Sequence, residues 1–228
     1  MRYITNNLSA VRREIVAAEQ RVGREGRTRM LAAVKYGSDE ELGALLASGV
    51  TEVGENRVQQ LLAHWSSFEA YGTKVHFIGS LQTNKVKYII DKVAMIHSVD
   101  SLRLAEVIDR QAAQHELCMD VLVEINSGCE ESKSGLAPDE VEDFCLELAK
   151  FPHINLRGFM TMAPKCEKNE DYRKYFQKTY KQCLDIWQKK LHNIGSPILS
   201  MGMSDSFEAA IEEGSDIVRI GRALFQPR

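Results

Sequence analysis

This 228-residue sequence lacks paired cysteines, long apolar runs and a large surplus of either charge. The five cysteines are scattered and contain no Cys-x-x-Cys pair, which argues against both a disulfide framework and a zinc site. No apolar run approaches membrane-spanning length, and residues 1–7 lack the continuous hydrophobic region of a signal peptide. These absences predict a cytoplasmic protein with no metal and no membrane partner.

The charges are close to balance, with 29 Lys and Arg against 32 Asp and Glu. A net charge of −3 and a pI near 6.1 argue against nucleic acid as a partner, because such proteins carry a basic surface. No Gly-x-Gly-x-x-Gly follows the first predicted strand, which weakens a dinucleotide-binding fold. No Gly-, Ser- or Pro-rich linker divides the chain, so residues 1–228 are expected to form a single domain.

Strand-like and helix-like segments alternate along the whole sequence. A helix over Thr5–Glu25 opens it, with apolar residues at the spacing of one buried face. Amphipathic stretches at Leu102–Gln114, Pro138–Lys150 and Tyr172–His192 are long enough for crossover helices. The pattern predicts an α/β fold, a single (β/α)8 TIM barrel with an additional N-terminal helix; an open doubly wound sheet is the alternative. The eight predicted strands are Leu31–Val34, Glu52–Gly54, Val75–Ile78, Ala94–Ser98, Asp120–Ile125, Asn155–Met160, Ile198–Ser200 and Ile217–Ile220.

Lys35 follows the first predicted strand and precedes an acidic helix start at Ser38. In a parallel α/β fold, the carboxyl ends of the strands carry the chemistry. A lysine that is partly desolvated there and close to other cations loses some preference for the ammonium form and can condense with an aldehyde. The position therefore suggests a Schiff-base lysine, with an ordinary solvated lysine at a strand end as the alternative.

Small and hydroxyl residues gather after the last two predicted strands, in Ser200–Asp205 and Arg219–Ala223. The corresponding loops of barrels commonly form a phosphate site. Gly202 and Gly221 would let the backbone approach an anion, and Ser204 would add a hydroxyl. The alternative is structural: Ser204 or Asp205 caps a helix, and Gly221 only makes a turn.

Arg219 stands inside the apolar run Ile217–Ile220, where a charge is costly unless it is paired. It either anchors a carboxylate such as Glu55 or Asp100, or points into the barrel mouth toward a ligand. A pyridoxal phosphate ligand would unite these features, with its aldehyde on Lys35 and its pyridine nitrogen at Arg219. His97, at another strand end, is interpreted as a hydrogen-bonded structural histidine.

From about residue 5 to the end, the sequence resembles the YggS/PROSC family of pyridoxal phosphate homeostasis proteins. The resemblance implies the N-terminal barrel of alanine racemase, fold type III of the pyridoxal phosphate proteins. Tyr36, after the lysine, is a small departure from the family. The motifs that carry the resemblance are Ala33–Lys35, Gly54–Asn56, His76–Gly79, Leu81–Gln82, Asn84–Lys85, Ser98–Asp100, Gly158, Met160–Met162, Leu199–Asp205 and Arg219–Gly221.

The resemblance also implies a set of cofactor-binding residues, with pyridoxal 5′-phosphate attached covalently and reversibly to one lysine. Those residues are Lys35 for the aldehyde, Ser200, Ser204 and the backbone of Gly221 and Arg222 for the phosphate, Arg219 for the pyridine nitrogen, and Asn56 and His76 along the cofactor.

An arginine at the pyridine nitrogen keeps the ring unprotonated and makes it a poor electron sink. Related racemases take a second base from another domain, whereas this sequence ends at Arg228, soon after the eighth predicted strand. The expected function is therefore pyridoxal phosphate homeostasis without robust catalysis. We expect a monomer whose partners are apo-enzymes that receive the cofactor, together with amino or keto acids as ligands. A pyridoxal phosphate-dependent racemase or lyase, and a barrel enzyme acting on a small phosphorylated substrate, are the alternatives.

Overall fold

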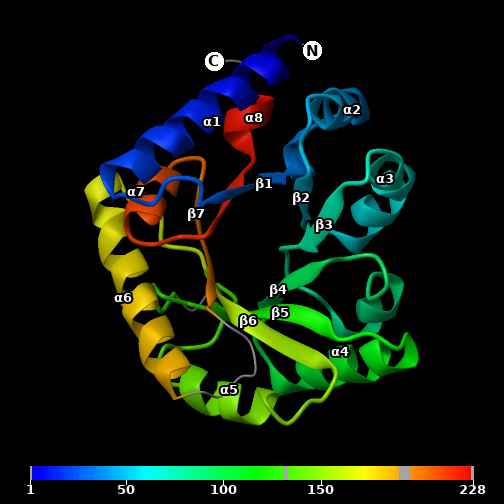
Figure 1. Cartoon of the computed structure of the whole chain (residues 1–228). Coiled ribbons are helices and arrows are strands. Elements are labelled where there is room, and N and C mark those ends of the chain that lie inside the picture. The colour runs from blue at the N-terminus through cyan, green and yellow to red at the C-terminus, as the bar shows by residue number, and fades with distance from the viewer. Residues whose placement is uncertain (1, 131–132, 190–195, 227–228) are drawn as a thin grey trace.

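Eight parallel strands close into a barrel in the computed structural model, which describes residues 2–130, 133–189 and 196–226 (Figure 1). Each strand pairs with its neighbours in sequence, and β8 returns to pair with β1, where Leu31 lies opposite Arg219. The predicted (β/α)8 barrel is confirmed, and the open sheet is excluded. The strands are β1 (Arg29–Ala33), β2 (Glu52–Glu55), β3 (Lys74–Phe77), β4 (Met95–Val99), β5 (Met119–Ile125), β6 (Ile154–Thr161), β7 (Ile198–Met203) and β8 (Ile217–Ile220).

Helices surround the barrel, and their buried apolar residues pack against the strands or against neighbouring helices. No described helix is long and apolar enough to cross a membrane. The helices are α1 (Arg2–Arg21), α2 (Asp39–Ala47), α3 (Val58–Ala70), α4 (Leu102–Gln114), α5 (Val141–Leu148), α6 (Asn169–Gln188), α7 (Phe207–Glu212) and α8 (Arg222–Phe225), with short 3-10 helices η1 (Val34–Tyr36) and η2 (Thr83–Tyr88).

The additional N-terminal helix is α1, which lies along α7 and α8 (Figure 1). Its buried face includes Leu8, Val11 and Ile15, as the apolar spacing predicted. Asn7 is 4% exposed, and its Nδ2 donates to the carbonyl of Leu224 at 3.0 Å. Because this amide satisfies main-chain acceptors on α8, the first and last helices are tied together.

The predicted crossover segments differ from the structure mainly at their ends. The segment predicted over Pro138–Lys150 is the shorter α5, and α6 begins at Asn169, three residues before the predicted Tyr172. The predicted end of that helix, His192, lies outside the described residues. Between β3 and β4 the chain forms η2 in place of a full crossover helix, so this connection stays close to the barrel rim.

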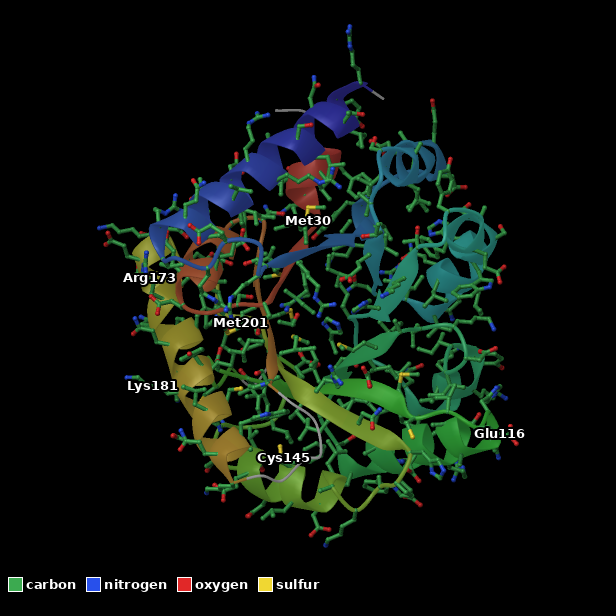
Figure 2. The ribbon with its side chains drawn as sticks, viewed as in Figure 1. Met30, Glu116, Cys145, Arg173, Lys181 and Met201 are labelled. Atoms are coloured by element: carbon green, nitrogen blue, oxygen red, sulfur yellow. The ribbon has the colours of Figure 1, made fainter. Side chains whose placement is uncertain are left out.

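Side chains fill the barrel interior, so the gap between the strands in the ribbon is packed (Figure 2). Met95, Leu122 and Met160 form a small buried cluster that is separate from the main core between the strands and the helices. Side chains alternate along a strand, so Glu124 points to the same inner face as Leu122. The interior is thus apolar in part and carries buried polar groups beside that cluster.

Candidate functional site

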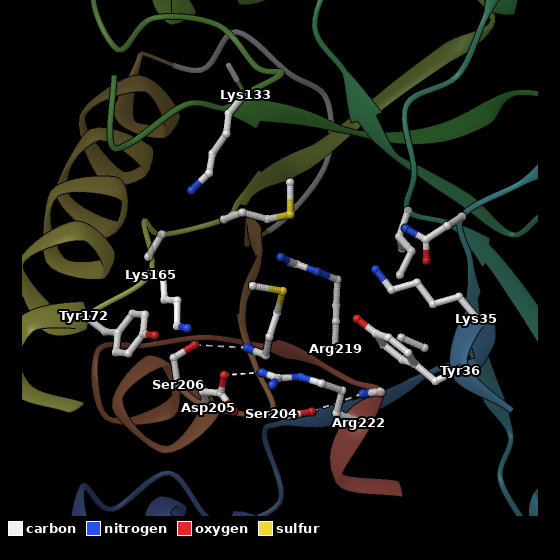
Figure 3. A pocket seen from close by; sticks show the side chains of 17 residues that line it. Lys35, Tyr36, Lys133, Lys165, Tyr172, Ser204, Asp205, Ser206, Arg219 and Arg222 are labelled. Atoms are coloured by element: carbon white, nitrogen blue, oxygen red, sulfur yellow. Dashed lines mark hydrogen bonds and ion pairs between the residues drawn. The ribbon is translucent and has the colours of Figure 1, made fainter. Parts of the chain in front are cut away.

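A cavity of about 370 Å³ opens at the carboxyl ends of the strands. It is lined from β1 and η1 on one side and from the segments after β6, β7 and β8 on the other (Figure 3). The predicted residues Lys35, Asn56, Ser204, Arg219 and Gly221 all line it. Residues far apart in the sequence therefore meet where the polar strand ends predicted a site.

Lys35 lies in η1, directly after β1 ends at Ala33, and its side chain reaches the cavity. Its Nζ is 5.0 Å from the ring centroid of Tyr36, within the range of a cation–π contact. Lys35 is exposed; the prediction of partial desolvation is wrong, because the strand stops one residue earlier and the turn carries the lysine into the open mouth. The amine is accessible to a ligand in the cavity.

Ser204, Gly221 and Arg222, named here the anion cradle, lie together at one side of the cavity (Figure 3). The Ser204 hydroxyl accepts from the backbone N–H of Gly221 at 3.4 Å and of Ala223 at 3.2 Å. The Arg222 guanidinium pairs with Asp205. Hydroxyl, backbone N–H groups and a guanidinium are donors that suit an oxyanion, so this part of the cavity matches a phosphate group.

Two glycines were predicted to allow close approach to an anion, and the structure separates their roles. A Cβ on Gly221 would lie 2.7 Å from the Tyr36 ring, at the cavity wall. Gly202 instead has φ +90°, and a Cβ there would lie 2.9 Å from Cα of Phe207 and 2.6 Å from Cβ of Ala210. Gly202 therefore permits α7 to pack on β7 and does not face the ligand, since it does not line the cavity.

Arg219 is 4% exposed and forms part of the cavity floor. Its Nη1 donates to the main-chain oxygen and to the hydroxyl of Ser200, both at 2.7 Å, and its Nη2 donates to the carbonyl of Thr161 at 2.9 Å. Burial lowers the pKa of Arg219 to about 10, and the nearby Glu124 opposes that shift. The guanidinium thus stays protonated at neutral pH, held by neutral oxygens and facing the cavity.

The carboxylate anchors considered for Arg219 are not its partners. The Glu55 carboxylate contacts Nδ1 of His64 at 3.0 Å, and an Asp100 oxygen accepts from the N–H of Gly135 at 3.4 Å. Glu124 is the acidic group that acts on Arg219. The pKa of Glu124 is raised to about 7, first by burial and then by Asp100, while Arg219 opposes the shift.

Two predicted cofactor residues, Ser200 and His76, do not line the cavity. Ser200 is fully buried, and its Oγ contacts both Arg219 and Nδ1 of His97, at 3.1 Å from the latter. Nδ1 of His76 lies 2.8 Å from Nε2 of His97. Both face the barrel interior behind Arg219, so in this structure they lie below the cavity lining, and the phosphate contact of Ser200 and the cofactor contact of His76 stay predictions. The interpretation of His97 as a hydrogen-bonded histidine is confirmed.

Several residues of the cavity were missed or set aside by the sequence reasoning. Tyr36, Lys133, Lys165 and Tyr172 line it, with Lys133 also paired to Glu130. Lys133 and Lys165 each follow a strand end, which is the signal that could have found them. Together with Lys35, Arg219 and Arg222 they make the lining cationic, which favours an anionic ligand.

No group of three or more His, Cys, Asp or Glu side chains suited to a metal is present among the described residues.

Comparison with known proteins identifies the family of the chain. Residues 6–228 match the family described as the N-terminal domain of alanine racemase. A pyridoxal phosphate homeostasis protein of Aquifex aeolicus is 41% identical over 222 residues, which cover 97% of this chain and 96% of the relative. The chain belongs to the pyridoxal phosphate homeostasis protein family.

Solved structures share the fold of this chain. A protein of unknown function from Bifidobacterium adolescentis superposes with a TM-score of 0.88 at 34% identity, covering 98% of this chain and 95% of that one. PipY of Synechococcus elongatus PCC7942, solved with pyridoxal phosphate bound, gives a TM-score of 0.84 at 24% identity, covering 97% and 99%. Both solved structures thus share this barrel over nearly the whole chain.

Proposed function

We propose that this homeostasis-family protein binds pyridoxal 5′-phosphate in the cavity, attaches it reversibly to Lys35, and contributes to keeping the free cofactor in balance without robust catalysis. The observation that carries the proposal is the meeting of an accessible amine, a protonated arginine and an anion cradle in one cavity. These three features match the aldehyde, the ring nitrogen and the phosphate of the cofactor.

An orphaned polar atom supports the fit. Oδ1 of Asn56 is buried without a hydrogen-bond partner among the described residues, and Asn56 lines the cavity. A buried acceptor left unpaired costs free energy, so a ligand that donates a hydrogen bond there is favoured. The cationic lining provides the complementary charge for a phosphorylated ligand.

The same structure argues against strong carbanion chemistry. A bound pyridoxal phosphate supplies an aldehyde and, when its ring is protonated, an electron sink. Arg219 donates hydrogen bonds and does not take up a further proton, so it favours an unprotonated ring. His76 and His97 are removed from the cavity and bonded to each other, so neither imidazole serves as a base there.

Absorbance spectroscopy tests the proposal. Purified protein incubated with pyridoxal phosphate should show a visible band that survives desalting, and Lys35→Ala and Lys35→Arg should lose it. Lys150→Ala, an exposed lysine paired with Glu147, is the control and should keep the band. Protein that stays colourless with the cofactor would overturn the proposal and favour a barrel enzyme for another phosphorylated substrate.

Racemase or lyase activity is the alternative that uses the same site. Incubating L-amino acids with the loaded protein in deuterated water should give no exchange of the Cα proton at enzymatic rates. Rapid exchange of the Cα proton would overturn the non-catalytic role and favour a racemase or lyase. The comparison also tests amino acids as ligands, because a spectral change without exchange would show binding without turnover.

We further infer a cytoplasmic monomer, with residues 1–228 as one cofactor-binding domain that delivers pyridoxal phosphate to apo-enzymes. All five cysteines are free, which fits a reducing compartment. Transfer to an apo-enzyme at a rate above free release would support delivery, whereas equal rates would reduce the protein to a buffer. Light scattering of the purified protein measures the oligomeric state.

A further inference from the structure

Buried polar groups connect one end of the barrel to the cavity floor. Nε2 of His76, on β3, lies 4.0 Å from the carboxylate of Glu52 at the start of β2. Nδ1 of His76 is 2.8 Å from Nε2 of His97 on β4, and Nδ1 of His97 is 3.1 Å from Oγ of Ser200 on β7. Arg219 on β8 completes the series through its 2.7 Å bond to that oxygen. His76, His97 and Ser200 are named the polar column.

The two ends of the polar column determine the order of its protons. At one end, the Glu52 carboxylate attracts a proton on Nε2 of His76, which leaves Nδ1 of His76 as an acceptor. Nε2 of His97 then carries the proton that it donates to His76, and Nδ1 of His97 is an acceptor for the Ser200 hydroxyl. At the other end, the Ser200 oxygen accepts from Arg219. His97 then donates once and accepts once, and His76 accepts at Nδ1 while its Nε2 proton faces the Glu52 carboxylate, so each ring has the single proton of a neutral imidazole.

The reverse order satisfies these groups less well. It would turn a lone pair of His76 toward the Glu52 carboxylate, which is an unfavourable electrostatic contact. It would also make the Ser200 oxygen accept from His97 and from Arg219 together, leaving the Ser200 proton to find another acceptor. Because unpaired polar groups in a dry interior are costly, the order that runs from Ser200 to Glu52 is favoured.

Burial and the surrounding cations keep both imidazoles neutral. Burial first, and then the cations Arg29 and Lys74, lower the pKa of His76 to about 3. Burial lowers the pKa of His97 well below its usual value, with smaller effects from His76 and Arg219. The acidic groups near the column are Glu52 beside His76 and Glu124 beside Arg219. A neutral column is therefore expected across the physiological range.

We propose that Ser200, His97 and His76 are positioning residues, which hold Arg219 in one orientation through a one-way chain of hydrogen bonds that ends at His76, whose Nε2 faces the Glu52 carboxylate at 4.0 Å. Three acceptors fix Nη1 and Nη2 of Arg219, while no described residue accepts from its Nε. The chain polarises the Ser200 oxygen and strengthens it as an acceptor for the cation. The consequence for pyridoxal phosphate rests on the proposed function: a fixed guanidinium presents its free N–H to the ring nitrogen.

Nuclear magnetic resonance of the ligand-free protein tests the column itself. Long-range 1H–15N spectra of protein labelled at its histidines should show both His76 and His97 neutral from pH 5 to 8, each with its proton on Nε2. A proton on Nδ1 of either ring, or a charged imidazole at pH 6, would overturn the proposal. In Glu52→Ala the Nδ1 tautomer should gain population; an unchanged tautomer would show that Glu52 does not order the chain.

Two serines give a matched comparison for the effect on Arg219. Ser200 and Ser215 are both fully buried, and among the described residues the Ser215 hydroxyl bonds main-chain atoms alone, those of Leu199, Met201 and Ile217. Ser200→Ala should weaken pyridoxal phosphate binding about tenfold, the effect expected when a charge-assisted hydrogen bond is lost, and should shift the pH dependence of the bound cofactor's absorbance. Ser215→Ala should leave both unchanged.

Equal losses in the two serine variants, or a Ser200→Ala variant that matches the parent, would overturn the positioning role. The spectral shift separates orientation from stability, because a general loss of stability does not change the electronic state of the cofactor. If the parent protein binds no cofactor at all, the proposed function fails, and the tautomer measurement in the ligand-free protein still decides whether the column is ordered.

Discussion

The anion cradle and the polar column are neighbouring polar regions that differ in their access to water. Arg222 of the cradle is exposed and pairs with Asp205 at the surface of the cavity. Arg219, three residues earlier, is buried and bonded to Ser200 and Thr161. The strand end at Ile220 separates the two arginines, so one belongs to the barrel interior and the other to its mouth.

This difference separates the groups that can bind and release a ligand from the groups that hold a fixed arrangement. Exposed groups can meet and release an anion without a large desolvation cost. Buried groups are fixed by one another and hold a single arrangement, because breaking any link leaves an unpaired polar atom in the interior. The proposed reversible binding of the cofactor needs both properties, and the structure places an exposed amine and the anion cradle above a buried, hydrogen-bonded floor.

The largest expected effect is the replacement of the buried arginine. Arg219→Met removes the donor for three oxygens and should lower the free energy of unfolding by about 3–5 kcal/mol. Urea denaturation of the ligand-free protein measures it. A loss below about 1 kcal/mol would mean that the interior does not depend on this cation, and the contrast with the cradle would disappear.

Glu124 makes the stability of the buried interior depend on pH, in contrast to the exposed cradle. Its pKa is raised to about 7, first by burial and then by Asp100. A carboxyl whose folded pKa exceeds its unfolded value near 4.5 stabilises the fold at low pH, and this contribution is lost as the pH rises through 7. Glu124→Gln should remove a decline of at most roughly 3 kcal/mol between pH 5 and 8. Urea titrations across that range measure it, with the exposed Glu147→Gln as the control.

Gly221 probes the cradle wall. In Gly221→Ala the new methyl group meets the Tyr36 ring at 2.7 Å and the carbonyl oxygen of Ala33 at 3.2 Å. The ring is half exposed and can shift, so we expect a loss of about 1 kcal/mol in stability and a loss of about tenfold or more in cofactor affinity. Gly43→Ala, inside α2 with open space around it, should gain stability by up to about 1 kcal/mol. Unchanged affinity in Gly221→Ala would place the phosphate elsewhere.

The smallest expected change in stability is at Arg222. Arg222→Ala removes an exposed ion pair and should change the free energy of unfolding by less than about 0.5 kcal/mol. Cofactor affinity should nevertheless fall, and more at low salt than at high salt, because exposed charges are screened. Calorimetry at two salt concentrations checks this, and an affinity equal to the parent's at both would remove Arg222 from the cradle.

Local patterns predicted the barrel well, since apolar runs and amphipathic stretches are properties of neighbouring residues. All eight strands were placed, with ends that moved by a few residues where capping and turn geometry decide. The cavity was also foreseen in part, because polar residues follow the strands. Lys35, Asn56, Ser204, Gly221 and Arg222 reach it as expected, although Lys35 is more exposed than its place beside a strand indicated.

The sequence says least where the direction of a side chain depends on distant strands. The family resemblance assigned Ser200 to the phosphate, whereas in the structure the register between β7 and β8 shifts between Ser200 and Met203, and Ser200 lies in the interior. Its partner His97 lies 103 residues away in the sequence. No spacing along one strand reveals such a contact.

The sequence by itself determined the alternation of strands and helices, the acidic and basic balance, and the lysine, glycines and hydroxyls at the strand ends, because each depends on short-range chemistry. Only the tertiary structure decided that Arg219 is held by neutral oxygens, that two histidines are joined behind it, and that the amine of Lys35 stands in the open. Closing the barrel brings β3 and β4 opposite β7 and β8. That closure determines which polar groups are buried and which are accessible to a ligand.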